Sequence, residues 1–217
     1  MKKLLIITVA CILAHFTSNA QGPRFGISAG PAFANYDIKV EGITATASSK
    51  TGIAAGIFVD IPAGSHFSIQ PAVNYVQKGT KDSQTEEQTT FTAEIKVNTL
   101  EVPVMFLYNS NSPGGNLFLG AGPSFAYSLS GSTKSGDGTT SEKQDIKFGN
   151  TADDDMRRGD FGANFLIGYC FKSGLLFSFN YNAGFSNLVP GTSDGSKMTS
   201  HYAAIKIGYT FGGSGKK

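Results

Sequence analysis

Residues 161–186, FGANFLIGYCFKSGLLFSFNYNAGFS, determine the fold predicted for this chain. Bulky apolar or aromatic residues alternate with small or polar ones over positions 161–171, and the alternation resumes over 175–186 after Lys172-Ser173-Gly174. Successive side chains of a strand point to opposite faces, so the pattern predicts an antiparallel hairpin with one apolar face. Each half has the roughly ten residues and the aromatic ends that a lipid-facing barrel strand needs.

Six further stretches with the same alternation surround this hairpin, at residues 24–36, 52–61, 67–78, 94–108, 117–129 and 201–211. With the hairpin they predict about eight strands. Long polar stretches alternate with short turns, and the long ones are residues 37–50, 79–93, 130–159 and 187–197. Short periplasmic turns and long outer loops are typical of bacterial outer-membrane proteins. We therefore expect an all-β, transmembrane, antiparallel up-and-down β-barrel in the outer membrane of a Gram-negative cell, surrounded by outer-membrane lipid.

The first 20 residues have the pattern of a secretory signal peptide. Lys2 and Lys3 precede an apolar run over residues 4–14, and a polar stretch ends in small residues at Ser18 and Ala20. We expect residues 1–20 to be removed and residues 21–217 to form one barrel domain. The apolar run is about half the roughly 20 residues that a spanning helix needs, which disfavours a helical anchor. The apolar stretch before Cys11 is too short for a lipoprotein cleavage site.

The composition favours strands and tight turns. There are 27 glycines, 17 phenylalanines and 8 tyrosines among 217 residues, a bias toward residues that suit sheets and turns. Without residues 1–20, Cys170 is the only cysteine, so no intramolecular disulfide can form. A closed barrel instead pairs the backbone of every strand. A net charge of +2 gives no reason to expect nucleic acid as a partner.

The interior of a barrel of about eight strands is filled by side chains, so we expect packed polar and small residues and no wide pore. The polar residues predicted to face inward are Asp60, Lys78, Glu101, Asn164, Asn180, Asn182 and Lys206. Their charges are of mixed sign, and in a low-dielectric wall we expect them to be paired, in a structural role. Cys170 shares this face and is expected to be a small buried filler.

The strand predicted at residues 94–108 has one irregularity. Ile95 and Val97 fall on the same parity as Glu101, which is predicted to face inward. Either a bulge near Asn98 changes the register, or this part of the strand stands clear of the bilayer.

Four segments carry a family resemblance: PRFGISAGPAFANY (23–36), GIFVDIPAGSHFSIQPAVNYVQKG (56–79), NTLEVPVMFLYN (98–109) and IKIGYTF (205–211). They resemble the PorT-like outer-membrane β-barrel domain family. The resemblance implies an outer-membrane barrel, and one branch of that family is linked to protein secretion. The last strand of outer-membrane proteins ends in an aromatic residue read by the barrel-insertion machinery, which corresponds here to Phe211. The chain departs from common patterns by continuing through residues 212–217 and by lacking tryptophan, so phenylalanine and tyrosine must form the aromatic belts.

The expected function is non-enzymatic: a structural, surface-interaction or secretion-accessory role, with an extracellular or secretion partner bound through the four long stretches. No cofactor is expected. One alternative is a barrel that transports small or hydrophobic solutes. Another is a lipid-modifying enzyme, because His66 and Ser68 form a His-x-Ser pair suited to nucleophilic catalysis. That pair follows a short turn and is predicted at the periplasmic end. A soluble lipocalin-type barrel would expose its phenylalanine and tyrosine rows to water as a large apolar patch.

Two motifs precede the hairpin. Asp153, Asp154 and Asp155 offer oxygen ligands for a hard cation, but they lack a spaced ligand pattern, so we expect a solvated loop and no metal site. Arg158-Gly159-Asp160 spells a tripeptide known from adhesive ligands. It lies where a loop enters a strand, away from a loop tip, and chance accounts for it better than adhesion.

Overall fold

The computed structural model describes residues 22–40, 43–46, 48–86, 89–110, 112–136, 141–191 and 195–211, and it forms ten β-strands in one sheet. The predicted signal peptide lies outside the described residues. The strands are β1 (Arg24–Val40), β2 (Ile43–Thr46), β3 (Lys50–Pro62), β4 (Phe67–Glu86), β5 (Thr89–Asn109), β6 (Gly115–Gly136), β7 (Ser141–Asp145), β8 (Gly159–Phe171), β9 (Leu175–Gly184) and β10 (Lys197–Phe211). Within these residues no helix is long and apolar enough to cross a membrane.

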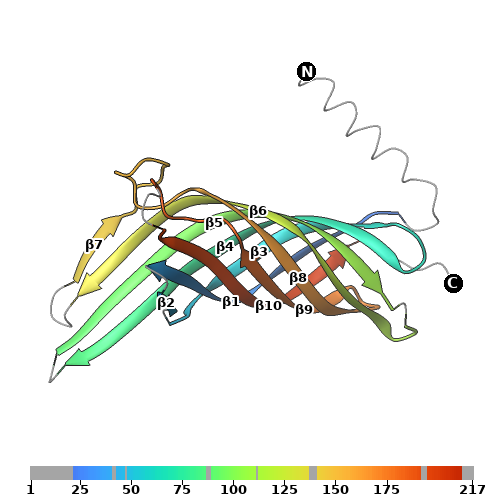
Figure 1. The fold of residues 1–217 in the computed structure, drawn as a ribbon. Coiled ribbons are helices and arrows are strands. Elements are labelled where there is room, and N and C mark those ends of the chain that lie inside the picture. Colours follow the sequence, from blue (N-terminus) through green and yellow to red (C-terminus); the bar gives the residue numbers. More distant parts are fainter. Residues whose placement is uncertain are drawn as a thin grey trace, which may run out of the picture.

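The sheet closes into a barrel because β1 pairs with both β3 and β10. β2 pairs with β1 and β7 pairs with β6, each outside the ring, so the remaining eight strands form the wall. Every pairing between named strands is antiparallel, and each wall strand pairs with the next one along the chain (Figure 1). This is the predicted up-and-down barrel.

Three short turns, at residues 63–66, 110–114 and 172–174, lie at one end of the barrel. Gly64 and Gly174 have φ of 116° and 89°, a left-handed conformation that glycine adopts without steric cost. Phe25 pairs with Phe211, so both ends of the wall sequence reach this same end. The turns agree with the predicted positions, and this end is called the short-turn end below.

At the opposite end three predicted loops contain strands, so that part of the prediction is wrong. β4 and β5 remain paired as far as Glu86 and Thr89, within the predicted loop 79–93. β6 continues to Gly136 and pairs with β7 inside the predicted loop 130–159, and β1 with β2 does the same inside 37–50. The alternation of bulky and small residues ends there, while serine and threonine still suit extended backbone.

The register between β5 and β6 shifts at the predicted position near Asn98, but the extra residue lies on β6. Asn98 pairs with Ser130 and Thr99 pairs with Ser128, so Leu129 is the extra residue. The shift does not turn β5 over, because Val97, like Thr99, stays buried.

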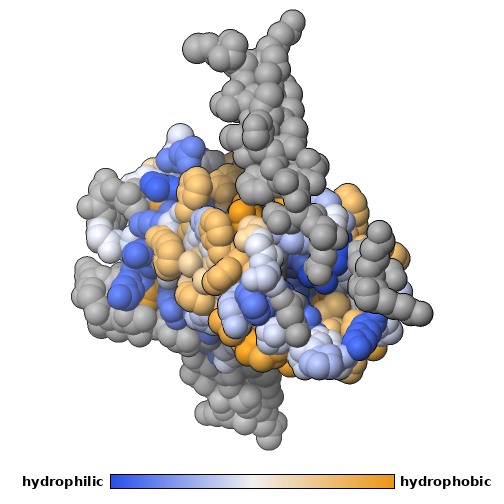
Figure 2. All heavy atoms as spheres, turned by 90° about the vertical axis from the view of Figure 1, so that its right-hand side faces the viewer, coloured by the Kyte–Doolittle hydropathy of each residue, from blue (hydrophilic) through white to orange (hydrophobic). Residues whose placement is uncertain are grey.

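The outer wall of the barrel is apolar. Its large hydrophobic side chains are 36–65% exposed and include Phe25, Ile57, Phe67, Phe106, Leu119, Phe161, Phe165, Ile167, Phe177, Ile205 and Phe211. Hydrophobic residues are visible at several places around the outside in the view onto the short-turn end (Figure 2). Aromatic residues pack together at both borders of this surface, as in Phe67–Tyr108 (5.6 Å between ring centroids) and Phe125–Phe161 (4.9 Å). Phenylalanine and tyrosine thus form the aromatic borders in this tryptophan-free chain.

Candidate functional site

The barrel interior has three parts: a cavity near the short-turn end, a polar belt in the middle, and an apolar plug at the opposite end. The polar belt is Glu101, Asn164, Asn180, Asn182 and Tyr202. The apolar plug is Tyr36, Val97, Met156, Leu188 and Met198.

Glu101 is the centre of the polar belt, and its side chain has no exposure to solvent. Its Oε1 accepts hydrogen bonds from the hydroxyl of Tyr202 (2.8 Å) and from Nδ2 of Asn164 (3.1 Å). Asn180 Nδ2 donates to Asn164 Oδ1 at 2.9 Å, and Asn182 Nδ2 donates to Ser124 Oγ at 3.0 Å. Bonds between β5, β8, β9 and β10 therefore cross the barrel and fill its middle. Hydrogen bonds to a buried charge are stronger than neutral ones.

A second buried group joins β4, β8 and β10. Lys78 Nζ donates to Ser200 Oγ at 3.0 Å, and Ser200 donates to Asp160 Oδ2 at 2.6 Å. The ammonium of Lys78 lies 3.7 Å from the Asp160 carboxylate and 5.4 Å from the ring centroid of Tyr202. Lys78 is thus neutralised inside the wall by Asp160.

Arg158-Gly159-Asp160 is not displayed as an adhesive loop would be. This agrees with the prediction that the tripeptide occurs here by chance. Asp160 is buried in the group just described. The Arg158 guanidinium lies 4.9 Å from the ring centroid of Phe148 and donates to the carbonyl of Ser128 at 3.1 Å. Neither charged end of the tripeptide is presented at a loop tip.

All seven inward candidates are buried, with at most 7% of each residue exposed: Asp60, Lys78, Glu101, Asn164, Asn180, Asn182 and Lys206. Asp60 forms an ion pair with Arg24, a residue that is not among the predicted inward set. Lys206 makes no ion pair within the described part of the chain, which departs from the expectation that all interior charges are paired. Phe211 ends β10 on the outside, 49% exposed, with its ring 5.0 Å from that of Tyr209.

Tyr202, Asp160 and Ser200 belong to these buried groups but were not among the predicted site residues. Tyr202 lies on the parity of Lys206 in the alternation of β10, so its inward position could have been read from the sequence. Its hydrogen-bonding role could not be read from the sequence, because its partners Glu101 and Asn180 come from other strands.

The apolar plug is formed by side chains from β1, β5 and β10 together with the segments that follow β7 and β9. Ile38, Ile95, Ile146, Phe148 and Val189 pack around it. A backbone hydrogen bond from Arg157 to Leu188 (2.9 Å) joins the two segments, and one from Leu188 to Met198 (2.8 Å) joins the second segment to β10. The inward position of Ile95 and Val97 is explained by this packing, since it covers apolar surface at the end of the lumen.

The acidic motif forms hydrogen bonds within its own loop. Asp154 Oδ2 accepts hydrogen bonds from the hydroxyl and the amide of Thr151, at 2.6 and 2.9 Å, and these bonds lower the pKa of Asp154. Asp155 Oδ2 accepts the Lys147 amide at 2.7 Å. The part of the chain that the structure describes contains no group of His, Cys, Asp or Glu side chains arranged to hold a metal ion.

His66 and Ser68 do not form a catalytic pair. His66 Nδ1 lies 2.9 Å from Ser65 Oγ, and its ring stacks on Tyr108 with centroids 6.0 Å apart. Ser68 is buried and accepts a hydrogen bond from Asn109 Nδ2 at 3.0 Å. The polar groups of His66 and Ser68 contact other residues. The hydrogen bond between nucleophile and base that acyl transfer needs is therefore not formed.

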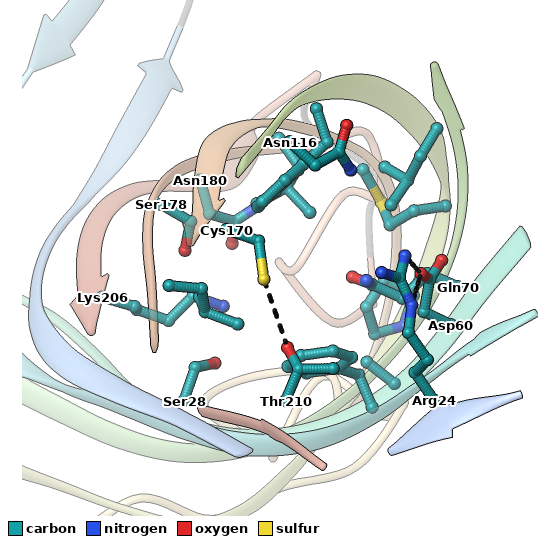
Figure 3. A pocket seen from close by; sticks show the side chains of 18 of the residues that line it. Arg24, Ser28, Asp60, Gln70, Asn116, Cys170, Ser178, Asn180, Lys206 and Thr210 are labelled. Atoms are coloured by element: carbon teal, nitrogen blue, oxygen red, sulfur yellow. Dashed lines mark hydrogen bonds and ion pairs between the residues drawn. The ribbon is translucent and has the colours of Figure 1, made fainter. Parts of the chain in front are cut away.

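The cavity lies on the short-turn side of the polar belt and has a volume of about 50 Å³ (Figure 3). Cys170 faces it from β8, and its Sγ lies 3.8 Å from Thr210 Oγ1. Cys170 is half-buried beside open space, so its expected role as a buried filler is only partly correct.

The closed eight-stranded wall, apolar outside and polar within, defines an outer-membrane barrel. Residues 19–189 match the model of the outer membrane protein beta-barrel domain family. Because this match covers more than half of the chain, the protein belongs to that family, and its location is the cell outer membrane.

Several solved structures are similar to this chain. Ail, the attachment invasion locus protein of Yersinia pestis, has 15% identity and a TM-score of 0.45, over 88% of this chain and 100% of Ail. OprG from Pseudomonas aeruginosa has 13% identity and a TM-score of 0.47, over 88% and 97%. Neisserial surface protein A has 14% identity and a TM-score of 0.43, over 86% and 97%. No curated protein matches the chain.

Proposed function

We propose that this protein is a non-enzymatic surface-interaction barrel that binds a partner through strands projecting outside the membrane. The proposal rests on the lengths of the strands. β4, β5 and β6 contain 20, 21 and 22 residues, whereas β8 and β9 contain 13 and 10. A transmembrane strand needs only about 9–11 residues, so roughly half of each long strand extends beyond the hydrocarbon.

These projecting parts form what we call the extended sheet: residues 79–86, 89–98, 130–136 and 141–145. They continue the wall of the barrel on the side opposite the short-turn end (Figure 1). Among the side chains that the structure describes, the large apolar ones that face outward stop at Leu100 on β5 and at Leu129 on β6. The end of this apolar surface marks the expected membrane border, and it leaves the extended sheet in water.

The edge of the extended sheet favours a protein partner. All five residues of β7 are exposed, and among the described strands β7 pairs with β6 alone. An edge strand offers unpaired backbone N–H and C=O groups, to which an extended segment of another chain can add. A partner that binds as an added strand therefore fits this surface.

A photocrosslinking amino acid at Lys143 on β7 tests the proposal in intact cells. We expect a discrete adduct of higher mass, because Lys143 is exposed on the proposed binding strand. The same amino acid at Ser173, in a short turn expected to be periplasmic, is the matched control and should not give that adduct. The same adduct from both positions, or none from positions 141–145, would contradict a surface partner.

We also propose, from the segments quoted above, that the protein is of the PorT-like type and that its partner belongs to a secretion apparatus. Insertion is then proposed to depend on Phe211 and the barrel-insertion machinery. If the partner is a secretion component, removing residues 137–145 should lower the amount of exported protein in the medium while leaving the barrel in the membrane. Unchanged export would leave only the general surface-interaction role.

Transport is the second candidate function, and the filled interior disfavours it. Glu101, Asn164, Asn182 and Tyr202 are each at most 2% exposed at mid-barrel. We expect the purified barrel to be silent in planar bilayers, even with Met156→Ser and Leu188→Ser in the apolar plug, since the polar belt still fills the lumen. Stepwise currents from the unmodified barrel would instead favour a transport protein.

A further inference from the structure

We propose that the cavity near the short-turn end is a binding site for a small amphipathic anion, a short-chain carboxylate, held by Lys206 and by an apolar wall. The inference is independent of the surface-interaction role.

The lining of the cavity is divided between two sides of the barrel. One side is mainly apolar and comes from β5, β6, β8 and β9: Met105, Leu107, Phe118, Leu166 and Leu176. The other side comes from β10, β1, β3 and β4 and carries most of the polar and charged groups. A ligand with one charged end and one apolar end matches this division, because a few placed polar groups orient a ligand within a mostly apolar pocket.

Lys206 supplies the charge. It is 7% exposed, and its side chain reaches from β10 into the cavity (Figure 3). Its ammonium makes no ion pair or side-chain hydrogen bond within the described part of the chain. A buried ammonium without a partner is costly, and an anion beside it removes that cost.

Among the residues that line the cavity, Lys206 carries the charge in excess. Arg24 and Asp60 also line it, but they neutralise each other in an ion pair. Glu101 does not line the cavity and forms no ion pair with Lys206, although its carboxylate charge acts on Lys206; its Oε1 accepts hydrogen bonds from Asn164 and Tyr202. The lining thus carries one net positive charge, which favours an anion over a cation or a neutral solute.

The size of the cavity limits the ligand. A volume of about 50 Å³ compares with roughly 10–15 Å³ for one water on the same measure, so there is room for about four water-sized groups. A carboxylate with a short alkyl chain, such as butyrate, is of this size. Arg24, Asn109 and Thr210 line the cavity from strand positions beside the short turns, so entry is from the short-turn end, on the expected periplasmic side.

Butyrate, n-butanol and n-butylammonium are the probes, titrated into the purified, folded full-length barrel in detergent micelles and followed by saturation-transfer NMR. We expect butyrate to bind and the other two to bind at least about tenfold more weakly. Lys206→Gln should weaken butyrate binding by about 10- to 100-fold, the range for loss of one hydrogen bond to a charged group. Lys143→Gln, on exposed β7, is the matched charge control and should leave binding unchanged.

Leu176→Phe fills space on the apolar side of the cavity without changing its charge. This variant tests the proposal even if Lys206→Gln does not fold. We expect this variant to lose butyrate binding. Equal binding of butanol, equal competition by chloride or phosphate, butyrate binding that survives both substitutions, or no butyrate binding to the unmodified barrel would each overturn the proposal.

Discussion

Replacing Glu101 with alanine is expected to destabilise the folded barrel by about 3–5 kcal/mol. The change removes the acceptor of the bonds from Tyr202 and Asn164 and leaves both donors buried. It also removes the carboxylate whose charge acts on Lys206. The free energy of unfolding is measurable by urea titration in lipid vesicles, with the electrophoretic mobility of folded and unfolded chains as the readout. Tryptophan fluorescence cannot serve, because the chain has no tryptophan.

Two variants give the controls for Glu101→Ala. Thr99→Val changes a buried residue on the same face of β5 whose Oγ1 has no hydrogen-bond partner, so it should change stability by less than about 0.5 kcal/mol. Tyr202→Phe removes the hydroxyl that contacts both Glu101 and Asn180 and should cost about 1–3 kcal/mol. If Glu101→Ala is as mild as Thr99→Val, the polar belt does not stabilise the barrel.

Replacing Phe165 with arginine is expected to cost about 2–4 kcal/mol, the cost of a cation on the lipid face at the bilayer midplane. Phe165 is 52% exposed on β8, between Phe161 and Phe171 at the two ends of the outer wall. Phe185→Arg is the matched control: Phe185 is 63% exposed beyond the end of β9, where the cost should fall to about 0–1 kcal/mol. The same urea titration measures both. Equal costs at the two positions would contradict the expected depth of the strands in the membrane.

The alternation that predicted the barrel is informative only where one face meets lipid and the other meets the packed lumen. This is why the wall, the short turns at 63–66 and 172–174 and the inward residues Asn164 and Asn180 follow from the sequence. The same reason explains the error at 79–93, where β4 and β5 continue with water on the outside. Strand pairing there depends on a partner strand, which no local pattern specifies.

The interior contacts could be predicted only in part. The parity of Asp60 and Lys78 indicates that they face inward, but Asp60 pairs with Arg24 and Lys78 with Asp160. Arg24 and Asp60 are directly opposite each other on the neighbouring strands β1 and β3, which requires their register. Lys78 and Asp160 lie on β4 and β8, so closure of the barrel brings that pair together. The apolar plug left a weak signal, since Met156 and Leu188 are isolated apolar residues in polar stretches. Such residues need a place to be buried, and the end of the lumen provides it.

The central claim is that the extended sheet stands outside the cell and the short turns face the periplasm. It is tested by labelling intact cells with a membrane-impermeant maleimide, using Ser135→Cys on β6 and Ser65→Cys in a short turn, each with Cys170→Ser. Both positions are exposed in the structure. The expected result is labelling of Ser135→Cys in intact cells and of Ser65→Cys only after the outer membrane is permeabilised. The reverse pattern, or equal labelling of both positions in intact cells, would contradict the claim.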